Sequence, residues 1–368
     1  MSELLAIGVS HKTAPLALRE RLAMTESAAE EFIRELVAHE EIREAVVIST
    51  CNRTEVYIVS RESVDAESVL LARLAHRADI RPTELVDIVY SPRNCDAARH
   101  LFKVTAGLES MIVGEHEIQG QVRRSYETAL GAGTTGPFTN RLFRAALQAG
   151  KRVRSETALG TARVSVPSVA VDLARETVGP LDRSSVVVIG AGETAELTAR
   201  ALSDQGVSTL FVANRRVERA RELASTFDGA VASLDELPQR MREADIVVSS
   251  TSSPHPIVGA EEIERVMEGR DGRPLLLIDI AVPRDIDSAC AEVPGVHVLD
   301  MDDLQNTVAR NLDVREGERE GAEAVVEPEE LAQDGQATVA AGLLEGLHPD
   351  GGLVEEPLHD RPGDRLAT

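Results

Sequence analysis

Short apolar runs and longer amphipathic stretches alternate over the first 110 residues of the chain. Short runs rich in β-branched residues predict strands, and apolar positions recurring every three or four residues predict helices. Strands are expected at Leu4–Val9, 45–50 and 56–60, and helices at Pro15–Met24, Glu26–His39, Glu67–Ala78 and Cys95–Ser110, with Thr25 as an N-cap. Because the strands at 45–50 and 56–60 are too close for a helical crossover, we expect antiparallel pairing. This part is predicted to be α+β, with a small sheet.

The rest of the chain has a helical segment followed by alternating strands and helices. From Ile112 to about Arg175 the spacing of apolar residues is helical, with a break at Gly131–Pro137. Beyond Ser185, apolar runs alternate with helical stretches, which is typical of a parallel sheet. Those predicted strands are Val186–Ile189, Thr209–Ala213, Ile246–Val248 and Leu275–Ile278.

The segment after about Val314 is acidic and rich in glycine. Its composition is typical of turns and disorder, with a short helix expected at Ala337–Leu347 and mobile residues beyond about 350. We expect dimerisation through this tail to be weak or absent, because it has few apolar positions at helical spacing.

Composition narrows the class of protein. The chain has 368 residues, 43% of them hydrophobic, and no run of transmembrane length or signal-peptide pattern, so a soluble, cytoplasmic protein is expected. Three scattered cysteines predict neither a disulfide framework nor a metal site.

The net charge of −23 with very little lysine is also typical of proteins from a salt-loaded, halophilic cytoplasm. Between Ile118 and Arg163 the charge is instead mostly basic, which indicates either a polynucleotide contact face or a solvated helix face.

A glycine-rich turn connects the first predicted strand of the second part to a helix. Gly190-Ala191-Gly192-Glu193-Thr194-Ala195 fits the dinucleotide-binding pattern, with two glycines for the turn and the pyrophosphate and a small residue for helix packing. Asn214, Arg215 and Arg216 end the next strand, where an acidic residue would indicate NAD. Arginines suit a 2′-phosphate, so a Rossmann-type domain that binds NADPH is predicted.

Cys51 lies in a polar loop, Ser49–Glu55, between two predicted strands. A structural cysteine usually lies within an apolar run. The neighbouring Arg53 guanidinium would favour the thiolate, which is the nucleophilic form. The loop therefore predicts covalent catalysis, and a buried, inert thiol is the alternative that the loop alone leaves open. Cys95 and Cys290 are interpreted as structural.

Six segments together resemble the glutamyl-tRNA reductase family, over roughly residues 4–315. They are Gly8–Pro15 with Arg19-Glu20, Ser49–Glu55, His100–Glu115, Gly150–Thr157, Ile280–Asp287 and Asp300–Leu304. The resemblance implies NADPH-dependent reduction of glutamyl-tRNA(Glu) to glutamate-1-semialdehyde through a Cys51 thioester, the first step of 5-aminolevulinate and porphyrin (tetrapyrrole) biosynthesis. It also implies a homodimer, and transfer of the intermediate to glutamate-1-semialdehyde aminomutase.

The resemblance also implies roles for individual residues. Cys51 would be the nucleophile, and His100 would handle its proton. Arg53 would bind the glutamate side-chain carboxylate as a bidentate partner. The remaining implied substrate contacts are Thr50, Asn52, Ser110, Glu115, His116, Glu117 and Gln121, although His116 stands where the family usually has another residue.

The expected architecture is α/β overall. An N-terminal α+β catalytic domain would span 1–155, a linking helix 156–175, a Rossmann-type NADPH domain 176–300, and a short or degenerate helical C-terminal region 301–368. Two other functions remain open: a different NADP(H) oxidoreductase of the shikimate dehydrogenase type, and a catalytically weakened regulatory protein that binds tRNA or a partner. The first gives no reason for the Cys51 loop, and the intact loop argues against the second.

Overall fold

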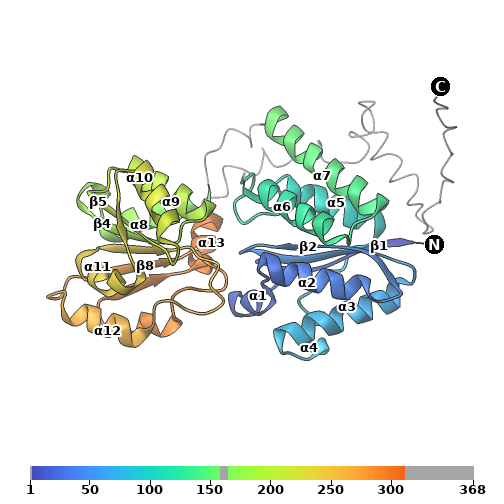
Figure 1. The fold of residues 1–368 in the computed structure, drawn as a ribbon, viewed down its shortest axis with the longest axis horizontal. Coiled ribbons are helices and arrows are strands. Elements are labelled where there is room, and N and C mark those ends of the chain that lie inside the picture. Colours follow the sequence, from blue (N-terminus) through green and yellow to red (C-terminus); the bar gives the residue numbers. More distant parts are fainter. Residues whose placement is uncertain (1, 116, 158–164, 311–368) are drawn as a thin grey trace, which may run out of the picture.

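The computed structural model describes residues 2–115, 117–157 and 165–310, which form two units, each with its own sheet (Figure 1). The first unit has a three-stranded antiparallel sheet in the order β1-β3-β2, with β1 at Glu3–Ser10, β2 at Ile42–Ser49 and β3 at Arg53–Ser60. All eight residues of the central strand β3 are buried. The predicted antiparallel pairing of β2 with β3 is confirmed, with Ser49 opposite Thr54. Cys51 therefore lies in the tight turn between these two strands.

Helices cover both faces of this sheet. Figure 1 shows α3 and α4 on one side and α5 and α7 on the other, while α2 and α6 flank the edge strand β2. Their bounds are α1 Leu16–Leu22, α2 Glu26–Val37, α3 Ser63–Ala78, α4 Pro82–Val86, α5 Asn94–Thr105, α6 Glu117–Ala132 and α7 Pro137–Glu156. Thr25 caps α2 as predicted, because its hydroxyl accepts a hydrogen bond from the Ala28 backbone N–H at 3.3 Å. The predicted break after Gly131 separates α6 from α7.

The second unit is a six-stranded parallel sheet in the order β6-β5-β4-β7-β8-β9. Its strands are β4 Ser185–Ile189, β5 Thr209–Ala213, β6 Ala230–Ala232, β7 Ile246–Ser249, β8 Leu275–Asp279 and β9 Val296–Leu299. This is the doubly wound order of a Rossmann fold, so the predicted class is confirmed. Ligands of such sheets bind where the strand order reverses, between β4 and β7 here. The sequence patterns missed the short strands β6 and β9.

Helices on both faces bury this sheet. They are α8 Val166–Val178, α9 Glu193–Asp204, α10 Val217–Thr226, α11 Leu237–Glu243, α12 Ala260–Glu268 and α13 Met301–Arg310, with short 3₁₀ helices at Leu181–Arg183, Leu234–Glu236 and Ser288–Glu292. One core cluster of this unit, which includes Met301 and Leu304, also contains three side chains from the first unit: Leu16, Met111 and Ile112. The two units therefore share apolar core as well as surface contacts.

Several expectations fall partly or wholly outside the described residues. The predicted linking helix over 156–175 overlaps the end of α7 and most of α8, and residues 158–164 between them are not described. The tail after 310, with the expected helix at Ala337–Leu347 and any role in dimerisation, is also not described. The domain bounds remain a prediction. Within the described ranges, none of the helices combines the length and apolar character needed to cross a membrane.

Candidate active site

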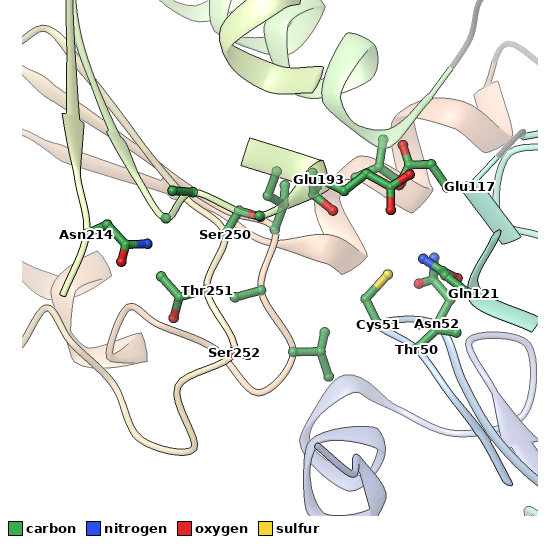
Figure 2. A pocket seen from close by; sticks show the side chains of 18 of the residues that line it. Thr50, Cys51, Asn52, Glu117, Gln121, Glu193, Asn214, Ser250, Thr251 and Ser252 are labelled. Carbon is green, nitrogen blue, oxygen red and sulfur yellow. Dashed lines mark hydrogen bonds between the residues drawn. The ribbon is translucent and has the colours of Figure 1, made fainter. Parts of the chain in front are cut away.

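A cavity of about 320 Å³ lies between the two units and contains both predicted motifs (Figure 2). From the first unit it is lined by Thr50, Cys51 and Asn52 of the turn and by Glu115, Glu117 and Gln121 around the start of α6. From the second unit it is lined by the glycine-rich turn Gly190–Thr194, by Asn214, and by the loops after β7 and β8. The fold thus brings the Cys51 loop to the edge of the Rossmann sheet, where dinucleotides bind in such folds.

Local hydrogen bonds hold the Cys51 turn. The Thr50 hydroxyl accepts from the backbone N–H groups of Asn52 and Arg53, both at 3.2 Å. The Thr50 backbone N–H donates to the Arg53 carbonyl at 2.8 Å and so closes the turn. The buried Arg19 guanidinium donates to the Cys51 carbonyl oxygen at 3.0 Å. Cys51 is therefore fixed by its backbone, and its sulfur is left facing the cavity (Figure 2).

The expected low pKa of the Cys51 thiol is wrong for this state of the protein. The pKa of Cys51 is raised to about 12, mainly by burial and also by the carboxylates of Glu115 and Glu117, against the opposing charge of Arg19. Arg53 is not among the main influences on this pKa, and its guanidinium is paired with Glu55. The thiol is neutral until positive charge enters the cavity.

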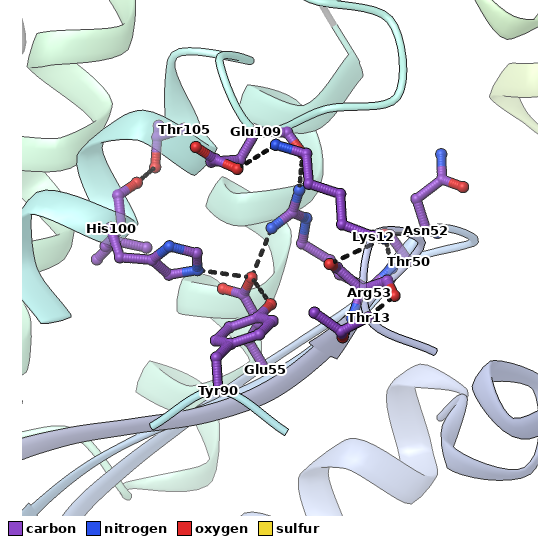
Figure 3. Close-up of polar contacts among 12 residues, drawn as sticks. Lys12, Thr13, Thr50, Asn52, Arg53, Glu55, Tyr90, His100, Thr105 and Glu109 are labelled. Atoms are coloured by element: carbon purple, nitrogen blue, oxygen red, sulfur yellow. Dashed lines mark hydrogen bonds and ion pairs between the residues drawn. The ribbon is translucent and has the colours of Figure 1, made fainter. Parts of the chain in front are cut away.

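Arg53 lies in a buried polar cluster behind the turn (Figure 3). Its Nη1 is 2.5 Å from Glu55 Oε1, and its Nη2 donates to the Glu109 carbonyl oxygen. Its side chain is 2% exposed and that of Glu55 is fully buried. Burial alone would raise the pKa of Glu55, but Arg53 and His100 hold that pKa well below its usual range. The guanidinium is therefore committed to Glu55, which disagrees with its predicted role as the partner of the substrate carboxylate.

His100 belongs to the same cluster. Its Nε2 lies 3.0 Å from Glu55 Oε1, and its ring lies 5.0 Å from the ring of Tyr90. Tyr90 and Tyr57 donate their hydroxyls to the two oxygens of Glu55, at 2.6 and 2.7 Å. The structure thus places His100 at Glu55, which disagrees with the predicted position beside the thiol. Sequence reasoning missed Glu55 as the centre of this cluster, although Arg53, Glu55 and Tyr57 alternate along β3 and so share one face of it.

Two carboxylates face the cavity next to Cys51. Burial raises the pKa of Glu115, and the nearby Ser110 hydroxyl opposes this. Burial, Glu115 and Glu193 raise the pKa of Glu117 to about 7, against the opposing charge of Arg124. Of the predicted substrate contacts, Glu115, Glu117 and Gln121 line the cavity, and Ser110 is buried close behind it. His116 lies outside the described residues.

The glycine-rich turn has the geometry that a bound pyrophosphate requires. Gly190 has φ +122°, and a Cβ there would lie 2.4 Å from the Ser250 carbonyl oxygen, so a side chain is excluded. A Cβ on Gly192 would meet open space in the cavity. Gly192 is also the N-cap of α9, whose backbone N–H groups point at that space. Ala195 is buried beneath the turn, as predicted for the small packing position.

A second cavity continues past the end of β5. It is lined by Asn214, Arg215, Arg216 and Arg219 together with the loop Thr251–Pro254. The Asn214 side chain accepts from the Arg216 backbone N–H at 2.7 Å, which orders the turn that presents both arginines. Arg215 and Arg216 are exposed here, as a site for a 2′-phosphate requires. Arg219 was missed by the sequence reasoning.

The loops after β7 and β8 form the rest of the wall; the second lies in the segment Ile280–Asp287, which carried the family resemblance but was given no role at the site. Buried Asp285 accepts from the Ser249 hydroxyl at 2.7 Å and from the Thr251 hydroxyl and backbone N–H at 2.6 and 2.8 Å. Buried Asp279 accepts from the backbone of Ala281 and Ile286. These carboxylates fix the residues that face the cavity. Over the described ranges, no group of His, Cys, Asp and Glu side chains is arranged to hold a metal ion.

Comparison with known proteins agrees with this geometry. Residues 7–157 match the family model for the N-terminal domain of glutamyl-tRNA(Glu) reductase. A glutamyl-tRNA reductase from Rubrobacter xylanophilus is 45% identical over 87% of this chain and 74% of its own length. The chain belongs to the glutamyl-tRNA reductase family. A second family member, from Pelotomaculum thermopropionicum, is 42% identical over 89% of this chain and 73% of its own length.

The second half of this glutamyl-tRNA reductase family chain has its own match. Residues 172–307 fit the family model for shikimate/quinate 5-dehydrogenase. This match explains why the sequence analysis left an oxidoreductase of the shikimate dehydrogenase type open as an alternative function. Among solved structures, glutamyl-tRNA reductase from Methanopyrus kandleri is 34% identical and covers 94% of this chain and 84% of its own, with a TM-score of 0.46. The cavity lies between the two matched ranges, so it needs residues from both.

Proposed function

We propose that this chain catalyses NADPH-dependent reduction of glutamyl-tRNA(Glu) to glutamate-1-semialdehyde, the first step of 5-aminolevulinate and tetrapyrrole biosynthesis. The observation that carries the proposal is that Cys51 and the Gly190–Glu193 turn line one cavity. A shikimate dehydrogenase-like activity on a small molecule would give no role to Cys51 of the first unit. Membership of the glutamyl-tRNA reductase family, over most of the chain, supports the use of both units.

The first chemical step is acyl transfer to Cys51. The sulfur attacks the carbonyl carbon of the aminoacyl ester, a C–S bond forms, and the C–O bond to the terminal ribose of the tRNA breaks. The thiol proton leaves through a cavity base, and the ribose oxygen takes up a proton. Gln121, Thr50 and Asn52 are the polar groups beside the sulfur that orient the acyl group (Figure 2).

The charge of the cavity explains how a thiol of high pKa reacts. The α-ammonium of the glutamyl group is attracted to Glu115 and Glu117, because both carboxylates face the cavity. Neutralising them removes two of the causes that raise the pKa of Cys51, and the ammonium charge itself favours the thiolate, so both act against the larger effect of burial. Glu117, with a pKa of about 7, takes up the thiol proton. Binding of the substrate thus activates the nucleophile.

The second step releases an aldehyde. NADPH, when bound, supplies the hydride that adds to the thioester carbonyl carbon. The C–S bond then breaks, and Cys51 leaves as a thiolate that recovers its proton. Gly190, Gly192 and Thr194 would hold the pyrophosphate on α9, and Arg215 and Arg216 the 2′-phosphate. His100 and Arg53 act through Glu55, which lies on β3, the strand that begins at the Cys51 turn.

The chemistry also suggests partners and a location. The product aldehyde is reactive, which favours direct transfer to glutamate-1-semialdehyde aminomutase. A charged tRNA substrate and a thiol that must stay reduced favour the cytoplasm. The many acidic side chains still suggest a protein adapted to high salt.

Trapping of the acyl-enzyme tests the function. Purified protein with tRNA charged with radioactive glutamate, but without NADPH, should retain label on Cys51, and added NADPH should release it as aldehyde. Cys51→Ser should bind NADPH but neither retain label nor reduce, whereas Cys95→Ser should behave as wild type. NADPH oxidation by wild type with free glutamate or shikimate, but not with charged tRNA, would contradict the proposal.

A further inference from the structure

Two adjacent residues of α1 each form an ion pair with the second unit. Arg19 Nη2 lies 2.5 Å from Asp302 Oδ1, at the start of α13. Glu20 accepts from the Arg284 side chain at 2.8 and 3.0 Å and from the Arg284 backbone N–H at 2.8 Å. Arg284 lies two residues after Val282 in the loop after β8, where Ile280, Ala281 and Val282 line the cavity. One short helix therefore contacts two separate parts of the Rossmann unit.

The same guanidinium also holds the nucleophile turn. Arg19 is 2% exposed and donates through Nη1 to the Cys51 carbonyl oxygen at 3.0 Å, and through Nε to the Ala14 carbonyl oxygen at 3.2 Å. Its donors have a fixed planar arrangement, so its partners share one geometry. The position of Asp302 is thereby tied to the position of Cys51.

The surroundings of these pairs make them geometrically specific. Leu16, one turn before Arg19, packs in the core cluster that contains Ile280 and Met301. The Glu20–Arg284 pair is bidentate, and its side chains are 15% and 28% exposed. By contrast, Arg124 and Glu193, a third pair between the units, are both more than half exposed, and such pairs contribute little.

We propose that Arg19 and Glu20 are positioning residues that set the gap between Cys51 and the cofactor wall of the cavity. This inference rests on the proposed function. Acyl transfer to Cys51 uses groups of the first unit, whereas reduction needs the first and second units in register. Loosening the α1 contacts should therefore slow reduction of the thioester and leave its formation unchanged.

The test separates the two half-reactions in single turnovers with charged tRNA(Glu). Glu20→Gln, Arg284→Gln and Asp302→Asn each weaken one of the two ion pairs, while the Arg19 side chain, which also holds the Cys51 turn, is kept. Each should slow NADPH-dependent release of the acyl group about 10- to 100-fold, the range expected for a displacement near 1 Å. Labelling of Cys51 without NADPH should stay within about two-fold of wild type. The Glu20→Gln/Arg284→Gln double variant should be no slower than the worse single variant, since the two side chains act as a pair.

Asp303→Asn is the matched control. Asp303 is the next residue of α13, but its carboxylate accepts from the Asp300 backbone N–H and, within the described part of the chain, forms neither a hydrogen bond nor an ion pair with α1, so both half-reactions should be unchanged. Equal loss of labelling and reduction in the other variants, or no loss of either, would overturn the proposal.

Amide hydrogen exchange gives a second measurement that needs no activity. In the Glu20→Gln/Asp302→Asn variant, the backbone amides of α1 should exchange faster than in wild type, because both contacts of α1 are weakened, whereas those of β4 should be unchanged. Unchanged exchange in α1 would overturn the positioning role. If wild type itself fails to reduce glutamyl-tRNA, the proposed function fails, and the exchange comparison still decides whether the two ion pairs hold α1 against the second unit.

Discussion

Replacing Glu55 with glutamine should destabilise the first unit strongly, because Glu55 is the anionic centre of the buried cluster behind Cys51. Its carboxylate lies 2.5 Å from Arg53, 3.0 Å from His100, and 2.6 and 2.7 Å from the hydroxyls of Tyr90 and Tyr57. Glutamine keeps the shape but leaves the buried Arg53 charge without its anion. Removing one partner of a buried pair costs about 3–5 kcal/mol of unfolding free energy.

The composition of the chain makes this measurement selective. The chain has three tyrosines and no tryptophan, and Tyr57, Tyr90 and Tyr126 all lie in the first unit. Urea unfolding followed by tyrosine fluorescence therefore reports on that unit alone. Glu67→Gln is the matched control, since Glu67 pairs with Arg93 near the surface, and such pairs contribute at most about 1 kcal/mol.

Acid titration gives an independent check that the ionised form of Glu55 stabilises the folded chain. The pKa of Glu55 is lower in the folded chain than in the unfolded chain, so its stabilising effect is present near neutral pH and is lost as the pH falls below its unfolded pKa. Wild type should lose stability in acid faster than Glu55→Gln. A loss below about 1 kcal/mol at pH 7, or parallel acid profiles, would refute the ion-pair account.

Three further perturbations test the cavity. Glu117→Gln should remove the rise in Cys51 labelling rate that wild type shows as the pH increases through about 7, and a rise preserved in the variant would exclude Glu117 as the base. Changing Arg215 and Arg216 to glutamine should weaken the binding of NADPH by about 1.5–3 kcal/mol per lost contact and leave the binding of NADH nearly unchanged, with the exposed Arg221→Gln on α10 as the control. Calorimetry that shows equal weakening for the two cofactors would refute the 2′-phosphate assignment. Gly190→Ala should lower stability by about 1–3 kcal/mol, whereas Gly192→Ala should fold normally and bind NADPH poorly; similar melting temperatures for the two would contradict the geometry of the turn.

Local spacing predicted the fold well where the pattern was strong. The strands at Thr209–Ala213 and Val186–Ile189 and the glycine turn between them follow from runs of adjacent residues, and all are present. The strands β6 and β9 were missed because they are three and four residues long and partly exposed, so they carry little apolar signal. Such edge strands are recognised only through their pairing.

The candidate site was predictable in its motifs but not in its contacts. The Cys51 turn and the Gly190 turn were found separately, and their meeting in one cavity depends on packing between distant segments. The direction of Arg53 was misjudged although the period of two along β3 places Glu55 on the same face. The contact of Arg19 with Asp302 joins residues at opposite ends of the described chain, which no local pattern encodes.

The shared core of the two units has a consequence for synthesis of the chain on the ribosome. Leu16, Met111 and Ile112 complete an apolar cluster that also requires Leu304. At translation rates of about 5–20 residues per second, Leu16 waits on the order of tens of seconds for that partner. During this interval the nascent first unit presents an incomplete apolar surface to the solvent, and a chaperone has its longest opportunity to bind there. Cutting the chain between the units, as an expression strategy, would make that transient surface permanent.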